Sequence, residues 1–265
     1  MPGTSHLGFA AIIGAAVGFF SGLFGKGGSA VTTPALRVLL DVPRMSALAS
    51  PLPATLPITI SASFAYRDQH LIDWRIAGFT ALAGIPATVI GSLLTERVGG
   101  HTLMLMTGVF VLLLGVSFLR GTTNYSSVNP GLNTDAPPTA SMWKICVVGL
   151  GVGLLSGLLA NSGGILFAPL FVRVLHVPIR RALPTSLIAS CALAVPGTVT
   201  HSYLGHIDWA LAAALSCGAL PASYLGARLA IALKTETLEK AFGVFLILFG
   251  LYDVLWTELH HLWRP

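Results

Sequence analysis

Residues 22–34 read GLFGKGGSAVTTP and place glycines, a lysine and three hydroxyl side chains in a stretch otherwise apolar enough to cross a membrane. Glycine costs a helix about 1 kcal/mol relative to alanine and proline about 3, and lysine near a bilayer centre costs roughly 2.5–3.5 kcal/mol. The segment is therefore a loop outside the membrane or a deliberate helix break within it. A helix that starts after the glycines would offer free N–H groups to a small oxyanion, with Lys26 adding positive charge.

The same pattern returns 135 positions later, which favours the break. GFFSGLFGKGGSAVTTP at 18–34 aligns with GLLSGLLANSGGILFAP at 153–169, and IDW at 72–74 aligns with IDW at 207–209. No gap is needed over about 105 residues, so the sequence indicates a duplicated unit with one break in each half. Irregular backbone survives in hydrocarbon only inside protein or facing a water-filled cavity. Paired breaks of this kind point to a midplane substrate site in a transporter built from repeats.

Both breaks are predicted to bind the substrate, with Asn161 standing where Lys26 stands in the first half. Backbone N–H groups, hydroxyls and one cation suit a small anion, whereas a divalent cation would need carboxylates that neither break contains. The alternative for the glycines is close helix packing, with Lys26 snorkelling to an interface. Packing is favoured for Gly18, Ser21 and Gly22, and binding for residues 25–29. The predicted binding residues are Gly25, Lys26, Gly27, Gly28, Ser29, Thr33, Asn161, Ser162, Gly163 and Gly164.

The helices that follow the breaks carry a second polar set. Residues 50–63 read SPLPATLPITISAS, and residues 185–200 read TSLIASCALAVPGTVT. Prolines free backbone carbonyls that hydroxyls can satisfy, and hydroxyls in membrane helices also bond to their own backbone. Pathway lining and backbone bonding both stay open here. Ser50, Thr185 and Ser186 join the predicted substrate-binding residues.

The composition identifies a polytopic integral membrane protein. Of 265 residues, 54% are hydrophobic and 9% are charged, with a mean hydropathy of +0.80, whereas soluble domains carry about 25% charged residues. The net charge of +5 does not point to nucleic acid and mainly reports orientation. Cys146, Cys191 and Cys217 show no paired spacing and are predicted to be small buried apolar residues.

Each half is predicted to fold in the same way, within an all-α protein. The expected helices are 6–24, 29–40, 45–66, 74–97 and 101–119, then 145–160, 164–175, 180–201, 209–232 and 236–255. The pieces 29–40 and 164–175 are too short to cross upright, which gives about eight transmembrane helices plus two short re-entrant helices, with ten spans as the alternative. Residues 1–120 and 143–265 are the predicted repeats, and 121–142 a polar linker.

The relative direction of the two repeats stays open. Arginines gather at corresponding places in the halves, which mildly favours the same membrane side for both. These arginines are Arg37, Arg44, Arg173, Arg180 and Arg181. The aspartates of the two IDW corners are expected to cap the helices that follow, and the tryptophans to lie at the headgroup level.

The eight histidines show no metal-binding spacing. His201 and His206 bracket the second corner, where the first half has Tyr66 and Leu71. Neither a metal site nor a cofactor is predicted, and no catalytic residue is assigned.

The two glycine-rich stretches, the Val-Pro that follows each and the IDW corners resemble the TauE/SafE sulfite exporter family, also called the four-toluene sulfonate uptake permease family. The resemblance covers nearly the whole chain. It implies a duplicated multi-pass protein of the cytoplasmic (inner) membrane that moves sulfite, sulfonates or related sulfur-containing organic anions, often outward. Family members typically carry a run such as GxGGG, from which residues 25–29 and 160–164 depart by polar substitutions.

The predicted function is a secondary transporter, preferably an exporter, for a small sulfur-containing anion such as sulfite, thiosulfate or an organosulfonate, by alternating access around the two breaks. Neither enzymatic activity nor direct ATP use is expected, because the sequence lacks a P-loop motif. The expected partners are the anionic substrate and the lipid bilayer, without nucleic acid, and a homodimer is left open. The alternative is an integral-membrane enzyme or sulfur-relay component using a cavity cysteine such as Cys191.

Overall fold

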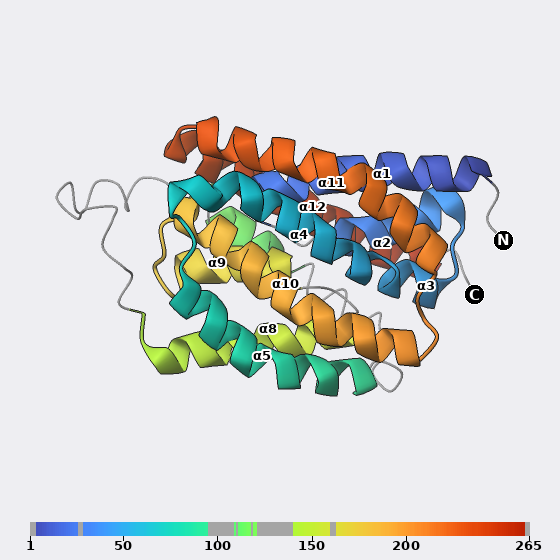
Figure 1. Ribbon diagram of the computed structural model, residues 1–265, viewed down its shortest axis with the longest axis horizontal. Helices are drawn as coiled ribbons and strands as arrows, with labels where there is room; N and C mark the ends of the chain where they lie inside the picture. The colour runs from blue at the N-terminus through green and yellow to red at the C-terminus, as the bar shows by residue number, and fades with distance from the viewer. Residues whose placement is uncertain are drawn as a thin grey trace. The chain divides into compact units, whose positions relative to one another are not determined.

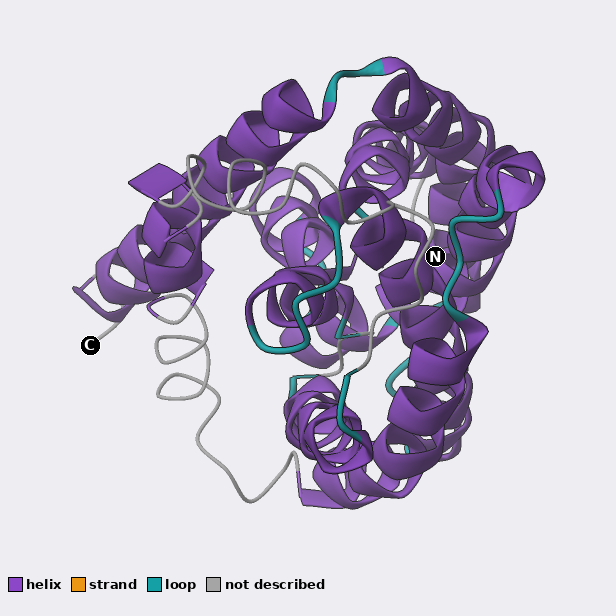
Figure 2. Ribbon diagram, turned by 90° about the vertical axis from the view of Figure 1, so that its left-hand side faces the viewer, coloured by secondary structure: helices purple, strands orange, loops and turns teal. Residues whose placement is uncertain are grey.

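The computed structural model describes residues 4–25, 29–94, 109, 111–117, 119–120, 140–159 and 163–262 (Figure 1). Every secondary-structure element within these ranges is a helix (Figure 2), which confirms the all-α prediction. The chain divides into two compact units. Unit 1 comprises Met1–Thr95 and Thr139–Ala232, and unit 2 comprises Glu96–Pro138 and Leu233–Pro265. Both sequence halves contribute helices to unit 1.

The helices of unit 1 follow the duplicated order that the sequence predicts. The first half contributes α1 (Thr4–Phe24), α2 (Ser29–Leu40), α3 (Arg44–Ala49), α4 (Pro51–Tyr66), a 3-10 turn (Arg67–Gln69) and α5 (Trp74–Leu94). The second half contributes α8 (Met142–Leu158), α9 (Gly164–Arg173), α10 (Ile179–Tyr203) and α11 (Trp209–Ala232). In unit 2, α12 covers Thr235–Leu262.

The helix predicted over 45–66 divides at Ser50 into α3 and α4. Pro51 and Pro53 have no N–H to donate, so the first turn of α4 cannot continue the hydrogen bonding of α3. The helix predicted over 101–119 lies largely outside the described residues, as does most of the predicted linker. The repeat boundaries at 120 and 143 stay a prediction.

Five segments of the described residues are long and apolar enough to cross a membrane, and one of them combines α3 and α4. They comprise residues His6–Phe24, Met45–Tyr66, Trp74–Leu94, Ile179–Tyr203 and Trp209–Ala232. The prediction of a multi-pass membrane protein is confirmed. The count of eight spans plus two short helices stays a prediction, and α9 begins where the short helix 164–175 is predicted and ends two residues earlier.

Helices of each half pack against helices of the other half. The first helix of each half packs along the last unit-1 helix of the other, so that α1 lies against α11 and α8 against α5. A Cβ on the glycines at these contacts would collide with the facing backbone, so the absence of a side chain lets the helices approach. The facing pairs are Gly14 with Leu215, Gly18 with Ala219 and Gly22 with Ser223, and then Gly149 with Thr80, Gly153 with Gly84 and Gly157 with Thr88.

These pairs advance by four residues in both helices, so α1 and α11 run parallel, as do α5 and α8. The packing role predicted for Gly18 and Gly22 is confirmed. Ser21 is fully buried beside them. The contact is the same in both halves at the offset of 135 residues, as a duplicated unit predicts.

The helices α4 and α10 lie side by side and run antiparallel (Figure 1). After α4 ends, the backbone N–H of Asp73 donates to Thr185 Oγ1 near the start of α10, at 3.0 Å. After α10 ends, the N–H of Asp208 donates to Ser50 Oγ just before α4, at 2.9 Å. Each corner is therefore fixed to the start of the other repeat's helix, and the two repeats are inverted relative to each other.

The arginine pattern is therefore wrong as a guide to orientation. Arg44 begins α3 at the end of unit 1 where α4 starts, whereas Arg180 lies in the first turn of α10 at the opposite end. Because α4 and α10 are antiparallel, matched positions of the two halves lie at opposite ends.

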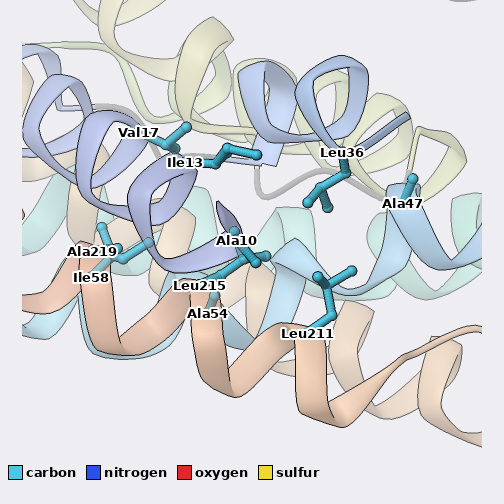
Figure 3. Close-up of a cluster of buried hydrophobic side chains, with 10 residues drawn as sticks. All are labelled: Ala10, Ile13, Val17, Leu36, Ala47, Ala54, Ile58, Leu211, Leu215 and Ala219. Carbon is cyan, nitrogen blue, oxygen red and sulfur yellow. The ribbon is translucent and has the colours of Figure 1, made fainter. Parts of the chain in front are cut away.

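A buried apolar cluster fixes the short helix α2 against its neighbours (Figure 3). Leu36 of α2 is fully buried among side chains from α1, α3, α4 and α11. The cluster comprises Ala10, Ile13, Val17, Leu36, Ala47, Ala54, Ile58, Leu211, Leu215 and Ala219. Because α2 follows the first glycine-rich stretch directly, this cluster holds the helix that emerges from the break.

The three free cysteines differ in exposure. Cys146 and Cys191 are half-buried, whereas Cys217 is exposed, so the prediction of a buried apolar residue is wrong for Cys217. The next residue, Gly218, packs against Ala11 of α1. Adjacent residues in a helix point about 100° apart, and Cys217 lies on the outward side.

Candidate functional site

The first break begins at Gly25, which has a φ of +66°. The Gly25 carbonyl accepts a hydrogen bond from Ser186 Oγ at 2.7 Å. Ser186 Oγ also lies 2.7 Å from the Leu183 carbonyl oxygen of its own helix. A Cβ at Gly25 would lie 2.6 Å from Ser186 Oγ and 2.7 Å from Leu183 Cα. Glycine is therefore required here both by the left-handed backbone and by the contact with α10.

Lys26, Gly27 and Gly28 lie outside the described residues. Ser29 begins α2, and Thr33 is buried one turn further along it. The structure thus places Gly25 and Ser186 together, as predicted members of one site, and positions the start of α2 directly after the undescribed residues.

Two residues that the sequence analysis did not assign to the site lie beside this break. Tyr66, the last residue of α4, is buried, and its hydroxyl donates to the Gly22 carbonyl at 3.2 Å. The Arg180 guanidinium acts electrostatically on Tyr66, and its Nη1 donates to the Ile231 carbonyl at 3.3 Å. Met45 occupies the position in the first half that matches Arg180. The sequence signal that could have identified Arg180 is an arginine in the second half at a position where the first half has an apolar residue.

The second break ends at Gly163, with a φ of +71°. The Gly163 carbonyl accepts from the N–H groups of Leu166 and Phe167 at 3.0 and 3.1 Å, so the glycine forms the N-terminus of α9. A Cβ at Gly163 would lie 2.7 Å from Val152 Cγ1, and Gly164 is buried. Asn161 and Ser162 lie outside the described residues.

The described flanks of the two breaks lie at opposite ends of unit 1. Gly25 contacts Ser186 near the start of α10, whereas Gly157, at the end of α8, lies beside His201 near the end of α10. Fifteen residues separate Ser186 from His201, which is about 22 Å of helix. Residues 26–28 and 160–162 lie outside the described residues. A midplane site shared by both breaks therefore stays a prediction.

We name these ends by their residues. The first-break end contains Gly25, Tyr66 and Arg180, and the second-break end contains Gly157 and His201. The two ends share the corner hydrogen bonds described above and differ in the side chains around them.

The predicted hydroxyl residues are engaged in hydrogen bonds. Ser50 and Thr185 accept from the corner backbones of the opposite repeat. Several other hydroxyls of α4 and α10 donate to carbonyls of their own helix, whereas Ser61 donates to the Leu220 carbonyl of α11 at 2.7 Å. The bonds within one helix run from Thr55 to Pro51, Thr59 to Thr55 and Ser190 to Ser186, at 3.2, 2.8 and 2.7 Å. Ser50 and Thr185 therefore have a structural role that the sequence did not reveal.

The corner aspartates cap the following helices. Asp73 Oδ1 accepts from the N–H of Ile76 at 3.0 Å, and Asp208 Oδ1 accepts from the N–H of Leu211 at 3.1 Å. The predicted capping role is confirmed. The adjacent tryptophans are exposed, and their headgroup anchoring stays a prediction.

A family model described as "Sulfite exporter TauE/SafE" matches residues 10–252 of the chain. The chain belongs to this family. A relative from Xylella fastidiosa (strain 9a5c), named "Probable membrane transporter protein", is 26% identical over 92% of this chain and 92% of its own length. "Probable membrane transporter protein YunE" from Bacillus subtilis (strain 168) is 24% identical over 90% of this chain and 94% of its own length. No solved structure gives a significant match.

Membership in the TauE/SafE family agrees with the architecture of unit 1. The apolar helices make the chain a multi-pass membrane protein, and the relatives carry transporter names. The protein is therefore a membrane transporter of the TauE/SafE family. The inverted repeat supplies the architecture from which many secondary transporters are built.

Proposed function

We propose that this TauE/SafE protein is a secondary transporter that exports a small sulfur-containing anion, such as sulfite, thiosulfate or an organosulfonate. The observation that carries the anion class is the Arg180 guanidinium at the first-break end, beside Tyr66, whose hydroxyl bonds to Gly22. A guanidinium matches the oxygens of such anions in charge and geometry. The family description names sulfite, which supports the sulfur chemistry.

The first-break end supplies further anion-binding groups. The N-terminus of α2 follows the break and offers backbone N–H groups and the positive end of a helix dipole. Lys26 lies next to Gly25 in the sequence and adds a second cation. Replacing the hydration shell of an anion requires several donors at once, and a cation together with a helix N-terminus provides them.

Alternating access follows from the inverted repeats. The corner bond from Asp73 to Thr185 fixes one end of the α4–α10 pair, and the bond from Asp208 to Ser50 fixes the other. We propose that the protein opens one end while the other stays fixed, so that the anion reaches one side of the membrane at a time. The glycine-packed pairs α1–α11 and α5–α8 then move as rigid bodies.

The test is uptake and efflux of labelled sulfite, thiosulfate and methanesulfonate in proteoliposomes. Arg180→Gln and Lys26→Ala are expected to weaken apparent affinity roughly 10- to 100-fold, because each removes a charge-assisted hydrogen bond. Arg228→Gln is the matched control, since Arg228 is exposed on α11 over the Tyr224 ring at 6.0 Å. Equal losses in all three variants would contradict the assignment of the site. Absence of wild-type flux for all three anions would contradict the substrate class.

A further inference from the structure

Two histidines meet at the second-break end. His201 is fully buried, and its Nδ1 lies 3.1 Å from the Nδ1 of half-buried His206. The ring centroids are 5.3 Å apart, and the backbone of Gly157 lies beside His201. In the first repeat the matching positions are Tyr66, which donates to Gly22, and Leu71.

The geometry of the two imidazoles favours the binding of one additional proton by the pair. Two facing imidazole nitrogens form a hydrogen bond only when one carries a proton and the other offers a lone pair. One added proton keeps this bond and makes it charge-assisted, which strengthens it. A second added proton would oppose two N–H donors and two positive charges.

The helices packed around the two histidines are the next place to look for titratable groups. Among the described residues, His206 is the titratable group that acts electrostatically on His201. Asp208 lies two residues beyond His206, where it caps α11 and donates its N–H to Ser50. The residues of α4 and α5 that lie against Gly157 and Gly197 carry no titratable side chain, and they are Leu52, Thr88, Gly91 and Ser92.

We propose that the His201–His206 pair is the proton-binding site that couples anion transport to a proton gradient, an inference that rests on the transport function proposed above. The pair lies only at the second-break end. At the first-break end the matching position is Tyr66, whose phenol does not titrate near neutral pH. Proton binding thus acts on one of two otherwise similar ends. A proton that moves with the anion also lowers the net charge transported.

Direct titration tests the site without any substrate. The full-length protein in lipid nanodiscs, labelled with ¹⁵N-histidine, would be followed by NMR from about pH 5 to pH 8, where imidazoles titrate. His201→Tyr and His206→Leu assign the two rings. The expected result is uptake of one proton that shifts both rings together, as coupled sites do. Independent titration of the rings, or no titration of either, would overturn the proposal.

Transport by His201→Tyr tests the coupling. This variant copies the first repeat, because tyrosine can bond to the Gly157 carbonyl as Tyr66 does to that of Gly22. His70→Asn is the control, since His70 is exposed and has a φ of +50° that asparagine tolerates. The probe is labelled thiosulfate, which stays ionised across the pH range used.

His201→Tyr is expected to keep thiosulfate exchange at equal pH and to lose roughly tenfold of the transport driven by a pH gradient, within the usual range of coupling between sites. His70→Asn is expected to retain both. Unchanged gradient-driven transport in His201→Tyr would overturn the proton site and leave the transport function standing. Absence of wild-type exchange would instead count against the transport function, with the titration still deciding the proton site.

Discussion

The two ends of unit 1 share one backbone plan and carry different chemistry. At the first-break end the phenol of Tyr66 bonds to the Gly22 carbonyl beside Arg180, whereas at the second-break end His201 and His206 lie beside Gly157. Glycine contacts, capped corners and cross-repeat hydrogen bonds are matched at both ends. Duplication therefore preserved the groups that hold helices together, and divergence changed the groups that we propose bind an anion at one end and a proton at the other.

The largest expected effect breaks the shared plan. Gly22→Val and Gly157→Val each place side-chain atoms against backbone of the facing helix. Each is expected to lower stability by about 1–3 kcal/mol, through overpacking that the facing backbone cannot relieve. Thermal unfolding in detergent measures the loss. Gly8→Val is the control because a Cβ there meets nothing within 4 Å. A much larger loss at one end than at the other would contradict the symmetry.

The cross-repeat hydrogen bonds give the next largest effect. Ser50→Ala and Thr185→Val each leave a corner aspartate N–H without its acceptor, at a cost of about 1–2 kcal/mol. Hydrogen exchange followed by mass spectrometry should show faster exchange at the affected corner alone. Thr200→Val is the control, since the Thr200 hydroxyl bonds within its own helix to Pro196. Faster exchange at both corners in either variant would contradict independent fixation of the two ends.

The smallest expected effect concerns Cys191. It is a free, half-buried cysteine on α10, between the two ends. A transporter that uses the groups at the ends should tolerate Cys191→Ser, with anion flux changed by less than about twofold, because a volume-conserving change at a half-buried position costs little. Loss of flux in proteoliposomes would instead favour the sulfur-relay alternative.

Helix positions could be read from the sequence because their signals are local. The helix predicted over 29–40 is α2 with the same bounds, and the helix predicted over 209–232 is α11. Prolines, glycines and the IDW corners mark where backbone bonding stops, and apolar stretches mark what enters lipid. The prediction failed for the arginine pattern, because spacing along the chain does not give the direction of a helix in space.

The sequence alone determined the membrane environment, the duplication, the helix limits and the glycines that allow close packing. Each follows from solvation or from backbone geometry at the residue itself. Tertiary structure decided that α1 pairs with α11, that α4 and α10 run antiparallel and that each corner bonds to the other repeat. It also brought Arg180 to the first break and His206 to His201. These contacts join residues whose proximity depends on how the second repeat is turned relative to the first, and no local propensity encodes that turn.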